Sequence, residues 1–187
     1  KPASWLKKGT KIIRRNNANL LDLVNQMLEL QKLESGNLKI DWQLGDIIPL
    51  LQTIFEQFQA YAQSKVQKME FISQMEELQM DFDEEKILRI VSNLLSNAIK
   101  YTPENGQISL EVAVRAIPEL HPNSCLVINV KDSGPGIPTE ELPNIFNRFY
   151  QADNNTSKIG TGIGLSLTMD LVQLLGGNIT VDSIEGQ

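Results

Sequence analysis

Three polar side chains along one predicted helix have the chemistry to hold a metal ion and a phosphate group. Asn93, Asn97 and Lys100 stand at positions i, i+4 and i+7 and therefore form a polar stripe along a helix. Side-chain amide oxygens suit a hard cation, and an ammonium group suits a phosphate. Asparagine inside a helix costs roughly 0.5 kcal/mol or more relative to alanine, so a plain solvated face would favour Lys and Glu. This helix alone does not decide between a ligand site and a merely polar face.

Segment 132–137, DSGPGI, places a carboxylate at the end of a predicted strand. Asp132 can accept a hydrogen bond from an exocyclic amine such as that of adenine. Gly134 and Gly136 let the backbone approach a ligand closely. The alternative is an ordinary tight turn, because D-x-G-x-G alone is a weak signal.

Segment 160–165, GTGIGL, opens the last predicted helix with glycines at every second position. Glycines at a helix N-terminus expose backbone N–H groups and the positive end of the helix dipole, which favours phosphate binding. The spacing does not fit the dinucleotide motif G-x-G-x-x-G, and the chain contains no G-x-x-x-x-G-K-[ST]. Both a Rossmann domain and a P-loop enzyme are therefore disfavoured.

The segment between these glycine motifs joins aromatic residues to a polar tract. Residues 146–150, FNRFY, precede residues 151–158, QADNNTSK. We expect the aromatic side chains to anchor a mobile loop, since a loop bounded by two glycine motifs is the expected form of a lid over a nucleotide. Arg148 is predicted to reach the terminal phosphates. The alternative is an arginine that only extends from a packed helix.

The elements that must position these residues follow from the periodicity of the chain. Leu6, Ile13, Leu20 and Met27 recur every seven residues, which predicts a helix of about 30 residues with a coiled-coil-like seam that stops at Gly36. No other segment has a matching seam, so the partner helix is expected in another chain or a missing neighbour. The later elements predicted are a strand at 38–44, a helix at 47–64, a hairpin-like strand pair at 69–75 and 78–82, a helix from an Asp83 cap to Tyr101, strands at 107–115 and 125–131, a helix at 161–175 and a strand at 178–183. This order favours a two-layer α+β sandwich preceded by one long helix.

The composition is that of an ordinary soluble globular protein, with 187 residues, 41% of them hydrophobic and 21% charged. No run approaches the roughly 20 apolar residues of a membrane helix, and the first residues lack the apolar core of a secretory signal. The net charge of −6 argues against nucleic acid as a partner. The single cysteine, Cys125, is predicted to be a small core residue rather than a nucleophile.

Four stretches in chain order resemble the N box, first glycine box, F box and second glycine box of histidine-kinase catalytic domains: NLLSNAIKYTP, DSGPGIP, IFNRFYQAD and GTGIGLSL. That family belongs to a larger group of ATPases shared with gyrase, heat-shock chaperones and mismatch-repair proteins. Residues 20–36 resemble the end of the second helix of the dimerisation hairpin. The resemblance covers nearly the whole chain and is closest to the kinase cores of hybrid two-component sensors.

The resemblance implies roles for individual residues toward ATP and Mg²⁺. Asn97 is expected to coordinate Mg²⁺ with Asn93 assisting, and Lys100 to contact the phosphates. Asp132 is expected to bind the adenine amino group, and Arg148 to approach the γ-phosphate. The other residues implied to form the nucleotide site are Tyr101, Gly134, Gly136, Ile137, Phe149, Tyr150, Gly160, Thr161, Gly162, Ile163, Gly164 and Leu165.

The resemblance also implies an organisation and a reaction. Residues 1–37 would be part of the dimerisation hairpin, and residues 38–187 the ATP-binding domain without the family's last strand. The γ-phosphoryl group of ATP would pass to a histidine on a hairpin helix absent from this chain, in the same or the partner protomer. Further implied partners are a response-regulator receiver domain and a second protomer in a homodimer. The implied location is the cytoplasm, with the intact protein a candidate for anchoring in the inner membrane.

One position separates kinases from hydrolases within the larger group. The hydrolases resemble one another in having a Glu where this chain has Asn93, and an amide cannot take up a proton at neutral pH. This difference favours transfer to a protein nucleophile over hydrolysis.

The family's phosphoacceptor motif is missing, and the single histidine, His121, is expected to be a surface residue of a loop. Two alternatives remain. A serine kinase of the anti-sigma type lacks the hairpin, so the seam at residues 6–30 speaks against it. A catalytically inert signalling module is disfavoured because the four motifs show no lesion.

Overall fold

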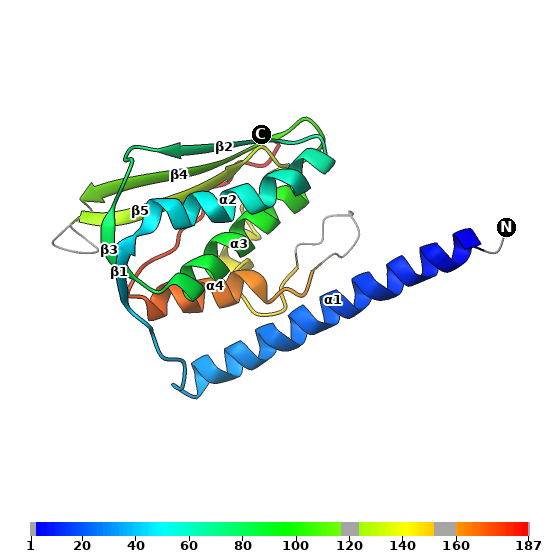
Figure 1. The fold of residues 1–187 in the computed structure, drawn as a ribbon, viewed down its shortest axis with the longest axis horizontal. Helices are drawn as coiled ribbons and strands as arrows, with labels where there is room; N and C mark the ends of the chain where they lie inside the picture. The colour runs from blue at the N-terminus through cyan, green and yellow to red at the C-terminus, as the bar shows by residue number, and fades with distance from the viewer. Residues whose placement is uncertain (1–2, 117–123, 152–159, 187) are drawn as a thin grey trace.

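The computed structural model describes residues 3–116, 124–151 and 160–186, so His121 and most of the predicted lid lie outside the described residues. A long helix, α1 (Ala3–Glu34), extends beyond a body in which helices lie against a sheet (Figure 1). The helices of the body are α2 (Ile47–Ser64), α3 (Glu84–Tyr101) and α4 (Gly164–Leu174), with a short 3-10 turn at Leu142–Asn144. The predicted two-layer architecture with one preceding long helix is confirmed.

The main sheet has the strand order β2-β4-β5 and mixes parallel and antiparallel pairs. Strand β2 (Lys68–Ser73) runs parallel to β4 (Gln107–Ala116), which pairs antiparallel with β5 (Ser124–Asp132). A separate small ladder joins β1 (Gln43–Asp46) to β3 (Gln79–Phe82). The strand predicted to start at residue 38 therefore starts only at Gln43.

The predicted hairpin of residues 69–75 and 78–82 is wrong, because β2 and β3 belong to different sheets. The carboxylate of Asp46 accepts hydrogen bonds from the backbone of Leu78 (2.9 Å) and of Ile48 (3.1 Å), which ties the start of β3 to the start of α2. Phe71 of β2 instead packs its ring against Phe55 of α2, with centroids 5.6 Å apart. Packing against α2 and pairing with β4 thus override the short connection between these strands.

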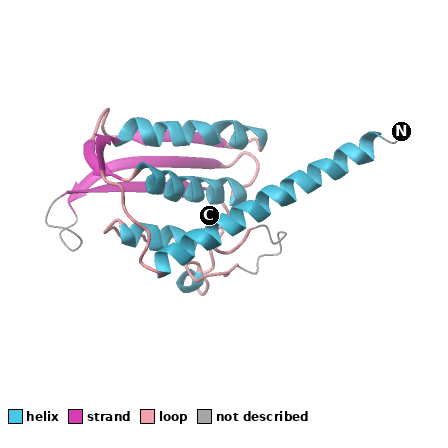
Figure 2. Cartoon of the chain, turned by 60° about the horizontal axis from the view of Figure 1, so that its bottom comes forward, coloured by secondary structure: helices cyan, strands magenta, loops and turns pink. Residues whose placement is uncertain are grey.

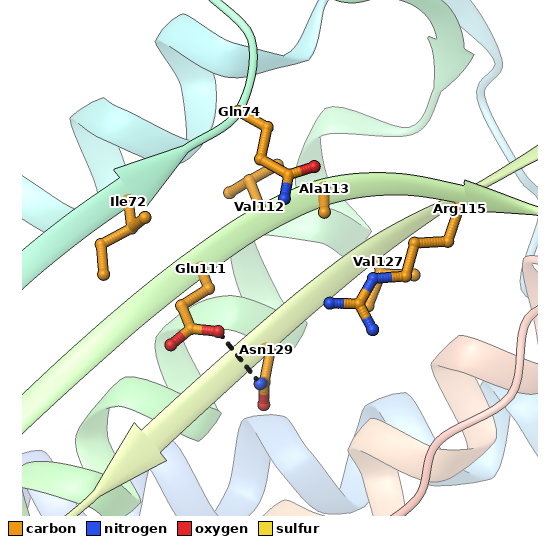
Figure 3. A pocket seen from close by; sticks show the side chains of 8 residues that line it. All are labelled: Ile72, Gln74, Glu111, Val112, Ala113, Arg115, Val127 and Asn129. Carbon is orange, nitrogen blue, oxygen red and sulfur yellow. Dashed lines mark hydrogen bonds between the residues drawn. The ribbon is translucent and has the colours of Figure 1, made fainter.

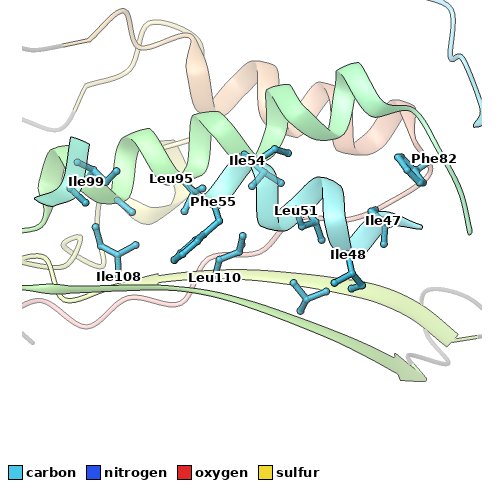
Figure 4. Close-up of a cluster of buried hydrophobic side chains, with 14 residues drawn as sticks. Ile47, Ile48, Leu51, Ile54, Phe55, Phe82, Leu95, Ile99, Ile108 and Leu110 are labelled. Atoms are coloured by element: carbon cyan, nitrogen blue, oxygen red, sulfur yellow. The ribbon is translucent and has the colours of Figure 1, made fainter. Parts of the chain in front are cut away.

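The main core lies between the sheet and helices α2 and α3 (Figure 4). Ile108 and Leu110 of β4 point toward Ile54 of α2 and Leu95 and Ile99 of α3, and all five are fully buried or nearly so. Burying each such side chain contributes about 1.5–3 kcal/mol. This packing fixes which face of α3 points inward, and so where its polar stripe points.

A second, smaller core joins the C-terminal part of α1 to α4 (Figure 2). Leu30 of α1 packs in a cluster with Ile163, Leu167 and Leu171. The seam residues Ile13, Leu20 and Met27 remain exposed, and the side chain of Leu6 lies outside the described part of the chain. The seam is therefore only partly covered within this chain. None of the described helices is both long and apolar enough to cross a lipid bilayer.

Two predictions near the C-terminus are wrong. The last helix begins at Gly164 rather than Thr161, because Gly160 and Gly162 have φ values of +144° and +70°, which a right-handed helix excludes. Residues 178–183 form no strand. The backbone N–H of Ile137 donates to Ser183 Oγ (2.8 Å), and that of Gly186 donates to the carbonyl of Pro135 (2.8 Å). The C-terminal tail, residues 178–186, thus lies along segment 132–137 instead of extending the sheet.

The start of α3 is held by Asp83, as predicted. Its carboxylate, which is 2% exposed, accepts from the Lys86 backbone (3.1 Å), the Lys86 ammonium (2.6 Å) and the Asp41 backbone (2.8 Å). Burial by itself would raise the Asp83 pKa, but these hydrogen bonds outweigh it and lower the pKa below its usual value. The ionised group therefore stabilises the fold above the ordinary carboxyl pKa, and this stabilisation is lost as the pH falls through the lowered value.

We expect Asp83→Ala to lower the free energy of unfolding by about 3 kcal/mol, because it leaves the buried Lys86 ammonium without its partner. Asp83→Asn keeps the cap but not the charge, so it should be milder and should flatten the loss of stability below about pH 4. Urea unfolding at several pH values measures both effects. Glu84→Gln, an exposed change one residue away, is the control. Equal urea midpoints for Asp83→Ala and the parent would contradict this account.

Candidate functional site

Helix α3 presents its polar stripe to the second glycine segment. One face of α3 is buried through Ile90, Val91, Leu95 and Ile99, while Asn93, Asn97 and Lys100 are half-buried on a neighbouring face. Helix α4 lies alongside α3 (Figure 1). The predicted residues of the N box and of the second glycine motif therefore meet along these two helices.

Asn93 makes the contact at one end of the stripe. Its Nδ2 donates to the hydroxyl of Thr168 on α4 (2.7 Å). A side chain at Gly164 would overlap with Oδ1 of Asn93. A side chain at position 164 would therefore force the Asn93 amide out of its present position.

Lys100 makes the contact at the other end. A Cβ at Gly160 would lie 2.9 Å from Lys100 Nζ, and Nζ itself donates to the hydroxyl of Tyr101 (2.7 Å). The backbone carbonyl of Tyr101 lies 3.2 Å from where a Cβ of Gly134 would be. The end of α3 therefore touches the second glycine segment through its lysine and the first through its backbone.

The first glycine segment holds Asp132 with one oxygen occupied. The backbone N–H of Gly134 donates to Asp132 Oδ1 (2.8 Å), and the exposed carboxylate has no recorded partner at Oδ2 among the described residues. Gly136 has φ +73°, and a side chain there would overlap with the carbonyl of Ile184. Ile137 points its backbone N–H at the tail rather than toward α3.

The polar groups gathered here fit a magnesium-bound adenine nucleotide. Asn97 is half-buried, and within the described ranges no hydrogen bond engages its amide. Asn93 and Asn97 offer amide oxygens to a hard cation, Lys100 offers an ammonium, and the start of α4 leaves backbone N–H groups without helical partners. Asp132 offers a carboxylate oxygen for an exocyclic amine. These are the groups that such a ligand requires.

The segment between the glycine motifs is tied together where its two ends meet. The backbone N–H of Phe149 donates to the carbonyl of Gly162 (2.8 Å), and Gln151 Nε2 donates to the carbonyl of Gly160 (2.9 Å). Phe149 has φ +65° and is 63% exposed, which is an unusual backbone for an aromatic residue. Tyr150 is half-buried at the same junction. Residues 152–159 of the predicted lid lie outside the described residues.

Arg148 does not face the stripe on α3. Its guanidinium pairs with Glu34 at the end of α1 and with Asp170 of α4 (3.5 Å). The hydrogen bond with Glu34 is the main reason that the Arg148 pKa lies above its usual value. Its role toward the γ-phosphate stays a prediction, and in this arrangement Arg148 links the aromatic segment to α1.

Helix α1 also reaches the second glycine segment directly. Thr161 Oγ1 donates to the side-chain oxygen of Gln26 (2.9 Å), and Arg89 of α3 pairs with Glu29 (3.3 Å). Burial is the main reason that the Glu29 pKa is raised, although Arg89 opposes the shift. Ile163 is completely buried beneath α1, whereas Leu165 is half-buried. The glycine segment therefore packs on one side against α1 and on the other against α3.

Two contacts at the site were not predicted from the sequence: Gln26 and Thr168. Both are buried polar residues next to apolar ones: Gln26 adjoins the seam of α1, and Thr168 lies between Leu167 and Leu171 on α4. A polar residue on a buried face needs a hydrogen-bond partner, and that need is the signal that could have identified both.

A hollow on the opposite face of the sheet contains none of the predicted site residues (Figure 3). It has a volume of about 100 Å³ and lies over β2, β4 and β5, with Glu111 and Asn129 joined across it (3.4 Å). Its other lining residues are Ile72, Gln74, Val112, Ala113, Arg115 and Val127. It is therefore separate from the site on the helical side.

Comparisons with known proteins identify the family of this chain. A family model for histidine kinase-, DNA gyrase B-, and HSP90-like ATPases matches residues 82–187. The chain is 34% identical over 180 residues to the sensor histidine kinase WalK of Bacillus subtilis (strain 168), and this match covers 94% of this chain and 28% of WalK. It is 34% identical over 185 residues to hybrid signal transduction histidine kinase D of Dictyostelium discoideum, and this match covers 96% of this chain and 12% of that protein. The chain thus spans less than a third of either relative.

Solved structures agree with the fold. The crystal structure of full-length ShkA in complex with AMPPNP matches with a TM-score of 0.81 and 26% identity, over 97% of this chain and 36% of that one. Histidine kinase ThkA in complex with the response regulator protein TrrA matches with a TM-score of 0.61 and 24% identity, over 81% of this chain and 42% of that one. The chain therefore belongs to the histidine kinase-, DNA gyrase B- and HSP90-like ATPase family, and both relatives described above are named histidine kinases.

Proposed function

We propose that this chain is the ATP- and Mg²⁺-binding core of a sensor histidine kinase, which transfers the γ-phosphoryl group of ATP to a histidine on a hairpin helix outside the chain. The observation that carries the proposal is the meeting of α3 with both glycine segments: Asn93 and Lys100 of the stripe lie against Gly164 and Gly160, and the backbone of Tyr101 lies against Gly134. The relatives named sensor and hybrid histidine kinases support phosphoryl transfer to a histidine rather than hydrolysis of ATP.

The chain's own residues have separate tasks in this proposal. Asp132 holds the adenine amine, Lys100 draws the phosphates toward the end of α3, and the N–H groups at the start of α4 bind phosphate oxygens. Mg²⁺, when bound to the amides of Asn93 and Asn97, supplies charge neutralisation for the triphosphate. Phosphoryl transfer needs mainly positioning and charge neutralisation, and none of these residues has to activate a water.

The amide at position 93 favours a kinase over a hydrolase. An amide cannot accept a proton at neutral pH, so Asn93 cannot serve as a general base for an attacking water. A protein nucleophile that approaches from outside the chain brings its own lone pair. The new bond is then between its nitrogen and the γ-phosphorus, and the bond that breaks releases ADP.

The proposal assigns residues 1–37 to a dimerisation hairpin and residues 38–187 to the catalytic domain. The exposed seam residues Ile13, Leu20 and Met27 on α1 support pairing with the missing helix and with a second protomer. A response-regulator receiver domain would take the phosphoryl group onward. Because the reaction requires ATP, the proposed location of this part is the cytoplasm.

Asp132→Asn and Asn97→Ala are each expected to weaken binding of a non-hydrolysable ATP analogue at least tenfold, because each removes a strong contact. Isothermal titration calorimetry with and without Mg²⁺ distinguishes the two variants, since only Asn97→Ala should also remove the gain in affinity that Mg²⁺ gives. Asp81→Asn on β3 and Asn129→Ala on β5, both at exposed positions, are the matched controls. Parent-like binding by either site variant would refute its assignment.

Incubating the chain with radiolabelled ATP, Mg²⁺ and a separate histidine-bearing hairpin is expected to label the hairpin with an acid-labile, base-stable phosphate. That stability is the property of phosphohistidine, whereas the reverse would indicate a serine kinase. No label at all would favour an inert signalling module. The same incubation with a hairpin whose histidine is replaced is the control.

A further inference from the structure

The hydroxyl group of Thr168 lies between the two helices that form the site. Thr168 is 1% exposed on α4, one turn after Gly164. Its Oγ1 donates to the backbone carbonyl of Gly164 (3.0 Å) and also meets Nδ2 of Asn93 on α3 (2.7 Å). The only hydroxyl proton goes to the carbonyl, so toward Asn93 the oxygen can act only as an acceptor.

This arrangement fixes which end of the Asn93 amide faces which way. The NH₂ group must point at Thr168, because an amide oxygen there would face an oxygen that has no proton to give. Oδ1 is therefore turned away from Thr168 and lies over the Cα of Gly164, where any side chain would overlap with it. Within the described ranges, Oδ1 of Asn93 accepts no hydrogen bond.

The stability of α4 does not explain the contact. The bond from Thr168 to the carbonyl four residues earlier satisfies its hydroxyl, as the bond from Thr53 to Pro49 (2.8 Å) does on α2 without any cross-helix partner. The additional bond from Asn93 therefore serves the amide rather than the helix. A buried polar contact that specifies an orientation is typical of a residue that positions a ligand group.

We propose that Thr168 is a positioning residue that turns the carbonyl oxygen of Asn93 toward the metal ion of the bound nucleotide. This inference rests on the proposed function. Without the hydroxyl, the amide has no acceptor for its NH₂ group and can rotate by 180°. In the rotated state Asn93 presents N–H groups, which repel a cation, in place of an oxygen ligand.

The first test is made without any ligand. In the ¹⁵N NMR spectrum of the parent, the side-chain NH₂ protons of Asn93 should exchange with water at least tenfold more slowly than those of exposed Asn105. Thr168→Val, which keeps the shape of the side chain, should remove this protection. Thr168→Ser should keep it. Equal exchange of Asn93 and Asn105 in the parent overturns the proposal, whether or not any variant folds.

The second test measures binding of a non-hydrolysable ATP analogue. Thr168→Val should weaken binding in Mg²⁺ about tenfold and leave binding in EDTA unchanged, and Thr168→Ser should restore the parent value. Ser166→Ala is the matched control, because it removes a buried hydroxyl from the same helix that bonds only to the carbonyl of Ile163 (2.8 Å). An unchanged Mg²⁺ advantage in Thr168→Val overturns the inference while the proposed function stands. A parent that binds no nucleotide in Mg²⁺ refutes the proposed function itself.

Discussion

The close approach of two backbone segments to one helix is the constraint on which the site depends. Helix α3 has to bury an apolar face and at the same time leave a row of amides and an ammonium beside it. Asn93 and Lys100 lie against Gly164 and Gly160, and the backbone of Tyr101 lies against Gly134, so that a Cβ at any of the three glycines would come within 3.2 Å of these groups. At Gly164 the Asn93 amide fills the space directly, so the glycine and the asparagine are one structural feature. The polar stripe and the glycine segments are therefore best understood as two sides of one site.

The rest of the fold serves to hold α3 in that orientation. The core beneath it sets its rotation about its own axis, and the buried pair of Asp83 and Lys86 sets where it begins. On the other side, α1 packs on the residues that follow the second glycine segment and binds Thr161 through Gln26. A movement of α1 would therefore act on the same backbone that faces α3. This link joins the long helix directly to the candidate site.

The sequence predicted features that depend on local chemistry. The cap at Asp83, the stripe on α3 and both glycine segments were found because helix periodicity and glycine geometry act over a few residues. The partner of β2 and the path of residues 178–183 were not found, because both depend on segments far away in the chain, β4 for the strand and segment 132–137 for the tail. Arg148 and Thr168 show the same limit at the level of side chains. Their partners, Glu34 and Asn93, are 114 and 75 positions away in the chain, and no local pattern indicates such contacts.

A crystal structure of the chain with a non-hydrolysable ATP analogue and Mg²⁺ tests the central claim most directly. The account predicts the purine at Asp132, the metal against the amide oxygens of α3, and the phosphates between Lys100 and the start of α4. A nucleotide found in the hollow on the far face of the sheet, or anywhere else away from α3, would contradict it.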